Sequence, residues 1–189
     1  KVFGKMRRLW KDREVSFEDY LENVVGLISC LKFFSHDILE KLAQDAIRLN
    51  GSRFYLFPWI LLLNLKALGY RLIAISGAPE FMAKMYLDKI GLFTEEINGS
   101  KYAFKDNVFT GELDVSILKN KGDFIIKKYK NTFDLKQCIA LGDTVSDASM
   151  FHAVGKVIAI NPTHLFAVEA KKNRWPVVVE RKDLILIFP

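Results

Sequence analysis

The sequence predicts an α/β protein: a Rossmann-like parallel sheet with helices on both faces, plus a small helical cap. Short apolar runs alternate with helical segments from residue 59 onward, which is typical of strand–helix–strand units. Two of these runs stop abruptly, at Ser76-Gly77 and at Gly142-Asp143. The earlier residues show helical periodicity and no strand pattern. We therefore expect a cap in residues 1–55 and an α/β core in residues 56–189.

Composition limits the classes of function. The chain has 189 residues, half of them hydrophobic, which is enough to bury a core. Its net charge of +6 favours anionic ligands. The basic residues are scattered and not interleaved with aromatic ones, so nucleic acid is not the expected partner, although a nucleic-acid binder remains a third hypothesis. The longest apolar run, residues 54–65, contains Pro58 and is too short to span a bilayer.

The two cysteines and the amino end bear on localisation. Cys30 and Cys138 lie far apart in sequence and lack the spacing of metal ligands, so we expect reduced thiols and a cytoplasmic protein. Nothing at the amino end resembles a secretory signal. The sequence gives no basis for predicting an oligomeric state.

The first part of the chain is expected to be helical. Residues 2–10 form a basic amphipathic segment, and Ser16 is placed to cap a helix that runs to about Leu31. A further helix is predicted from the Ser35-His36-Asp37 start to Asn50-Gly51.

The core is expected to alternate strands and helices. Asn98-Gly99, Asp106-Asn107 and Thr110-Gly111 indicate turns of a hairpin-like segment. The predicted order is helix 59–68, strand 70–75, helix 79–90, hairpin 95–113, helix 121–129, strand 138–142, helix 148–154, strand 156–160, helix 163–172 and strand 176–179.

The Gly142-Asp143 strand end is the first candidate site. Asp143 would lie at the carboxyl end of a buried strand, where open α/β sheets bind ligands, and Asp147 in the first turn of the next helix. Two carboxylates at one strand end suit Mg²⁺, which takes few protein ligands and keeps water and phosphate. Alternatively, Asp143 ends the strand and Asp147 caps the helix.

Two further loops carry candidate phosphate-binding groups. Ser76 and Gly77 end a strand before a helix, so a hydroxyl and backbone N–H groups could bind a phosphate there, or Ser76 could be an ordinary helix cap. Lys121 opens a helix, where the helix dipole disfavours a cation. An anion or carboxylate facing Lys121 would explain its position, and a solvated surface lysine is the alternative.

These three loops, in this order, resemble the second, third and fourth motifs of the haloacid dehalogenase superfamily, most closely its phosphoserine-phosphatase-like subfamily IB. The resemblance covers roughly residues 57–179. The matching stretches are Ile73-Ala74-Ile75-Ser76-Gly77, Asn120-Lys121-Gly122 and Gly142-Asp143-Thr144-Val145-Ser146-Asp147-Ala148-Ser149-Met150-Phe151, with later matches at Ala159-Ile160-Asn161-Pro162 and Arg174-Trp175-Pro176.

The resemblance implies a role for each residue. Ser76 and the Gly77 amide would bind the phosphoryl oxygens, and Lys121 would neutralise charge on the phosphoryl group and the nucleophile. Asp143 would ligate Mg²⁺, and Asp147 would hold either the water shell of the metal or Lys121.

Two departures from the family qualify the resemblance. The first motif, an Asp-x-Asp that supplies nucleophile and general acid, occurs nowhere in the chain. We expect the strand that carries it to precede Lys1. Val24 stands where phosphoserine phosphatases carry the arginine that binds the substrate carboxylate, which argues against phosphoserine. Arg7, Arg8 and Arg53 are alternative cationic contacts or surface residues.

The leading hypothesis is a Mg²⁺-dependent phosphomonoesterase. It would act on a small phosphorylated metabolite or lipid head group, through an aspartyl-phosphate on an Asp upstream of this chain. The alternative is a non-catalytic phosphate-binding or regulatory module of the same fold. An Asp-x-Asp upstream would favour the enzyme, and its absence would favour the module.

Overall fold

The computed structural model describes residue 8 and residues 30–50, 54–115 and 120–188. The helices expected over residues 2–10 and 16–31 lie outside these ranges, apart from Arg8 and the residues from Cys30 onward. Within the described ranges, no helix is long and apolar enough to cross a membrane.

Helices and strands alternate as the sequence predicts. The elements are α3 (His36–Asn50), α4 (Leu56–Ala67), β1 (Ile73–Pro79), α5 (Glu80–Lys89), β2 (Glu96–Lys105), β3 (Val108–Val115), α6 (Lys121–Tyr129), β4 (Ile139–Gly142), the short 3₁₀ helix η2 (Val145–Asp147), α7 (Ala148–Ala153), β5 (Lys156–Ile160), α8 (His164–Asn173), β6 (Val177–Arg181) and β7 (Leu184–Phe188).

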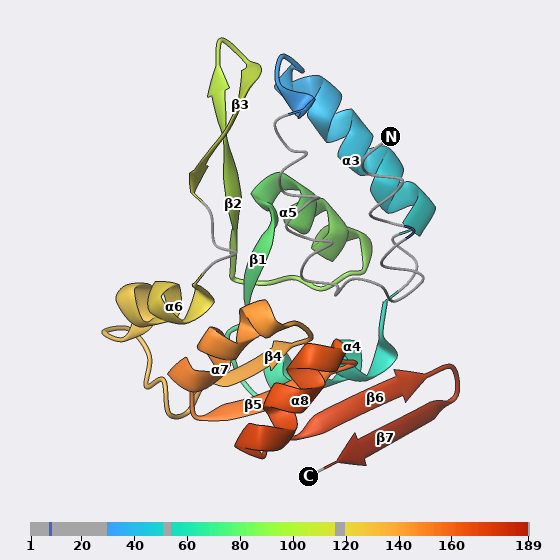
Figure 1. Cartoon of the computed structure of the whole chain (residues 1–189), viewed down its shortest axis with the longest axis vertical. Coiled ribbons are helices and arrows are strands. Elements are labelled where there is room, and N and C mark those ends of the chain that lie inside the picture. Colours follow the sequence, from blue (N-terminus) through green and yellow to red (C-terminus); the bar gives the residue numbers. More distant parts are fainter. Residues whose placement is uncertain (1–7, 9–29, 51–53, 116–119, 189) are drawn as a thin grey trace.

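The described strands form two sheets rather than the single sheet expected from the sequence. One has the order β1-β2-β3, in which β1 and β2 are parallel and β3 is antiparallel. The other has the order β4-β5-β6-β7, in which only β7 is antiparallel. Figure 1 shows the two sheets at opposite ends of the molecule, with strands running in clearly different directions. The α/β class is confirmed, with mixed sheets flanked by helices.

A tight hairpin joins β2 and β3. Asp106 and Asn107 both have positive φ, 50° and 63°, as a two-residue hairpin loop that matches the strand twist requires. The other two predicted turns are wrong, because Asn98-Gly99 and Thr110-Gly111 lie inside strands. Gly99 is needed there for close packing: a Cβ would come within 2.3 Å of the Glu80 Cα.

Two element boundaries differ from expectation, and one strand is additional. Helix α4 begins at Leu56, so Pro58 lies in its first turn, where the missing N–H costs nothing. The Glu180 carboxylate accepts hydrogen bonds from the Leu56 and Phe57 amides, both at 2.8 Å. Strand β1 continues through Ser76 to Pro79, and its pairing with β2 is irregular between Ile75 and Pro79. Strand β7 was not predicted at all.

One hydrophobic core links the two sheets. Its fully buried members include Phe166, Ala159 and Ala170, from the elements around β5 and α8. Ile73 and Ile75 of β1 pack against the same cluster. The two sheets therefore share a core although they share no hydrogen-bonded strand pair within the described ranges.

Candidate active site

A buried ion pair joins the Lys121 loop to the loop that follows β4. Lys121 is the first residue of α6, and its Nζ lies 2.5 Å from Asp147 Oδ1. The two side chains are only 9% and 4% exposed. The Asn120 side chain caps the helix by accepting from the Asp123 amide at 3.0 Å. A carboxylate thus faces Lys121, as its unfavourable position at a helix start suggested.

Asp147 also shapes the loop that follows β4. Its second oxygen, Oδ2, accepts hydrogen bonds from the amides of Asp143 at 2.9 Å and Thr144 at 3.1 Å. Thr144 and Asp147 form a capping box on η2. Asp147 therefore precedes α7 rather than lying in its first turn, and its side chain makes no cap hydrogen bond to α7, contrary to the predicted helix cap. It instead closes the capping box of η2 and pairs with Lys121.

Two glycines allow the candidate loops to approach each other. A Cβ on Gly142 would lie 2.6 Å from the Asp147 Cβ, and one on Gly122 would lie 2.2 Å from the Ser149 carbonyl oxygen. The Gly122 amide, one of the unpaired donors at the start of α6, donates to Ser149 Oγ at 3.1 Å. Sequence reasoning assigned no role to Ser149 or Thr144; a Ser or Thr beside an Asp before a short helix is the signal that could have found them.

Ser76 and Gly77 lie within β1 and not at a helix cap. Ser76 Oγ accepts from the Ala78 amide at 3.1 Å, and the Gly77 carbonyl accepts from the buried Ser100 hydroxyl at 2.8 Å. Helix α5 begins later, with Pro79 at its cap position. These two hydrogen bonds stay within β1 and β2 and involve neither Lys121 nor Asp143. The meeting of Ser76, Lys121 and Asp143 around one phosphate stays a prediction.

Of the two candidate metal ligands, Asp143 fits a Mg²⁺ ion better than Asp147 does. The Asp143 carboxylate is exposed, whereas both oxygens of Asp147 are engaged by Lys121 and by the two loop amides. No group of three or more potential metal-ligating side chains occurs among the residues that the structure describes. A Mg²⁺ ion held largely by phosphate, water and one carboxylate is compatible with this arrangement.

A second polar cluster lies at the other end of α6. The Asn98 amide donates to the Tyr129 hydroxyl at 2.9 Å, and Lys128 donates to Asn98 Oδ1 and to Glu96. Burial, with a contribution from Glu96, raises the pKa of Tyr129 to about 12. The hydrogen bond from Lys128 holds the pKa of Glu96 below its ordinary value. This cluster fastens the last turn of α6 to β2.

Three of the four residues considered for contact with the substrate lie outside the described ranges, namely Val24, Arg7 and Arg53. The fourth, Arg8, is exposed. The expectation about phosphoserine therefore remains a sequence argument.

The chain is an α/β protein in which the loops that carry Lys121 and Asp147 meet. The model of the haloacid dehalogenase-like hydrolase family matches residues 7–152, and the chain belongs to this family. Phosphoserine phosphatases are among the proteins that the chain is similar to.

Individual relatives agree with this assignment. The phosphoserine phosphatase of Methanocaldococcus jannaschii is 28% identical over 124 residues, covering 64% of this chain but only 56% of that protein. A substrate-bound phosphoserine phosphatase structure superposes with a TM-score of 0.62 at 22% identity, covering 97% of this chain and 81% of the other. A protein of unknown function from Bordetella pertussis Tohama I gives 0.67 at 15% identity, covering 92% and 79%. The structural likeness supports the fold.

Proposed function

We propose that this chain is the main part of a Mg²⁺-dependent phosphomonoesterase. The observation that carries the proposal is the buried Lys121–Asp147 pair. An ammonium has three N–H donors, and the described residues give Lys121 Nζ a single hydrogen-bond partner, Asp147. The remaining donors can bind phosphoryl oxygens. A buried ion pair contributes little net stability, which favours a role in function.

The other candidate residues take complementary roles. Ser76 Oγ and the Gly77 amide would bind phosphoryl oxygens, and Asp147 would keep Lys121 charged and in place. Asp143 would hold the Mg²⁺, which when bound would neutralise charge on the phosphoryl group. Such positioning and charge neutralisation account for most catalysis of phosphoryl transfer.

The nucleophile belongs to a segment outside this chain. No Asp-x-Asp occurs in the 189 residues, so in this proposal the aspartate that forms the aspartyl-phosphate would lie upstream of Lys1. The substrate would be a small phosphorylated metabolite in the cytoplasm, and Val24 argues against phosphoserine. The phosphoserine phosphatases among the relatives support the reaction class rather than that substrate.

The absence of an Asp-x-Asp motif from the 189 residues also favours a second function. Without a nucleophile, the chain would be a phosphate-binding or regulatory module that keeps the Lys121 loop but has no catalytic activity. The residues that the fold brings together, Lys121 and Asp147, serve binding equally well. The sequence upstream of Lys1 and an activity assay separate the two functions.

The test is hydrolysis of p-nitrophenyl phosphate by the longest natural form of the protein. We expect Mg²⁺-dependent turnover that EDTA abolishes, and a loss of about 10²–10³-fold in kcat on Asp143→Asn, because a carboxylate ligand is removed. Asp114→Asn, which changes an exposed carboxylate on β3, is the matched control and should retain full activity. Robust turnover by Asp143→Asn without metal would refute the proposed function.

A further inference from the structure

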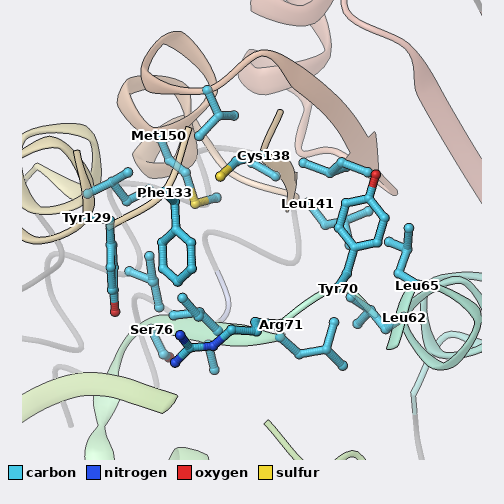
Figure 2. A pocket seen from close by; sticks show the side chains of 18 of the residues that line it. Leu62, Leu65, Tyr70, Arg71, Ser76, Tyr129, Phe133, Cys138, Leu141 and Met150 are labelled. Carbon is cyan, nitrogen blue, oxygen red and sulfur yellow. The ribbon is translucent and has the colours of Figure 1, made fainter. Parts of the chain in front are cut away.

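Strand β7 leaves one edge of its sheet open to solvent. The sheet has the order β4-β5-β6-β7, so its two edge strands are β4 and β7. At the β4 edge, residues 137–141 line a cavity of about 910 Å³ that β1 also borders. Figure 2 shows this edge, at Cys138 and Leu141, with Ser76 of β1 on the other side of the cavity. Figure 1 shows β7 at the lower margin of the molecule, with no other described element beyond it, so the β7 edge is the one that faces outward.

The side chains of β7 are apolar on both faces of the sheet. All five of its residues, Leu184–Phe188, are apolar, and each is 41–65% exposed. Ile185 lies opposite Glu180, whose carboxylate binds amides of α4, so Ile185 and Ile187 share the face that carries α4. The other three residues lie on the opposite face. Contiguous exposed apolar surface of this kind marks a site of association.

Strand β7 lacks the features that keep edge strands unpaired. Such strands usually carry charges, proline or irregular pairing. Strand β3, at the edge of the other sheet, contains Glu112 and Asp114, and its pairing with β2 shifts register. Strand β7 contains no charge and no proline, and it pairs with β6 in unbroken register. The chain therefore protects the β3 edge and leaves the β7 edge ready to pair.

The unpaired backbone groups of β7 belong to alternate residues. The two-residue loop Lys182-Asp183 joins β6 to β7, so the flanking pair, Arg181 and Leu184, is the hydrogen-bonded pair nearest the loop. Hydrogen-bonded and non-hydrogen-bonded pairs alternate along an antiparallel ladder. The amides and carbonyls of Ile185 and Ile187 therefore point away from β6, toward the open edge.

We propose that β7 pairs antiparallel with β7 of a second copy of this chain, across a two-fold axis at Leu186. Leu186 then lies opposite its own copy. Ile185 lies opposite Ile187, and Leu184 lies opposite Phe188, so every cross-strand pair is apolar and no like charges meet. The outward amides and carbonyls exchange hydrogen bonds across the axis, and the two four-stranded sheets become one continuous sheet.

The exposed surface of β7 fits a modest dimer interface. A fully exposed Leu, Ile or Phe residue has roughly 180–240 Å² of accessible surface, so exposed fractions of 41–65% give roughly 500 Å² per copy. Two copies together provide roughly 1,000 Å², near the lower limit of specific protein interfaces. An identical strand matches β7 in length and in its apolar character on both faces, which favours a second copy over a different protein. We expect a dimer that dissociates at micromolar concentration.

The test places charge at the two-fold axis, in the longest natural form of the protein. Leu186→Lys and Leu186→Glu each put like charges opposite one another, so each variant alone should raise the dimer dissociation constant about tenfold or more. A mixture of the two variants should form heterodimers, because opposite charges then face each other. Sedimentation equilibrium between about 1 and 200 µM protein measures these constants. Leu42→Lys, at a similarly exposed leucine on α3, is the matched control and should leave the dimer unchanged.

Ile187→Pro tests the backbone pairing separately. Proline at this position removes an N–H that points to the open edge and none that bonds to β6, so the hairpin should persist while the dimer dissociates. In the natural protein, hydrogen exchange of the Ile185 and Ile187 amides should slow as protein concentration rises. Urea unfolding of each variant shows that loss of the dimer is not loss of the fold.

Four results would overturn the inference. They are a monomer throughout this concentration range, a dimer that Leu186→Lys leaves unchanged, charged variants that fail to associate when mixed, and protection of the Ile185 and Ile187 amides that is independent of protein concentration. The last result would show that another segment of the same protein covers the edge. None of these measurements involves catalysis, so the dimer and the proposed function are tested independently.

Discussion

Lys121→Met is expected to lower the free energy of unfolding by about 3–5 kcal/mol, because it leaves the Asp147 charge buried without a partner. Methionine keeps the length and apolar stem of lysine, so the loss comes mainly from the charge. Urea unfolding at pH 7 measures it. Lys127→Met, on the exposed side of the same helix, is the control and should change stability by less than about 0.5 kcal/mol.

A double-mutant cycle separates the pair from its surroundings. Asp147→Asn keeps an oxygen for the Asp143 and Thr144 amides while removing the charge. The double variant Lys121→Met/Asp147→Asn should be more stable than the two single effects predict, by about 1–3 kcal/mol. Additive losses would show that Lys121 and Asp147 do not interact as described.

Gly122→Ala is expected to lower the free energy of unfolding nearly as much as Lys121→Met, although it changes no charge. The added Cβ would come within 2.2 Å of the Ser149 carbonyl oxygen, a backbone atom that cannot rotate away. Helices α6 and α7 must then separate, at a cost of about 2–3 kcal/mol in unfolding free energy. The same shift should move Lys121 away from Asp147.

Gly91→Ala is the comparison for this prediction. Gly91 has open space around a Cβ position and a positive φ of 67°, so alanine there suffers backbone strain alone, about 1–2 kcal/mol. The Lys121–Asp147 coupling energy, measured by the cycle above, should fall in the Gly122→Ala background and stay unchanged with Gly91→Ala. An unchanged coupling in both would contradict the packing argument.

The sequence predicted the fold wherever local patterns decide the structure. Helix α6 and strand β5 have the predicted bounds, because apolar periodicity and a clear start residue define each. The errors lie where packing overrides turn propensity: Asn98-Gly99 is buried in β2 against Glu80 and Tyr129. Strand β7 was missed, although its continuously apolar Leu184–Phe188 run is itself a strand signal.

Of the candidate site, the contact between Lys121 and Asp147 was predictable, but its details were not. The loop order led to Lys121 and Asp147, which the fold does bring together. The loop order could not show that both carboxylate oxygens of Asp147 are engaged, one by Lys121 and the other by the loop amides. That arrangement depends on the close approach that Gly142 permits. The division of the strands into two sheets also depends on long-range pairing that no local pattern encodes.

The most direct test is a crystal structure of the longest natural form of the protein with Mg²⁺ and orthovanadate, a mimic of the transferring phosphoryl group. We predict one vanadate whose oxygens accept hydrogen bonds from Lys121 Nζ and Ser76 Oγ, with Asp143 beside the metal. A vanadate bound elsewhere, or Ser76 and Lys121 on opposite sides of the molecule, would contradict the proposed site.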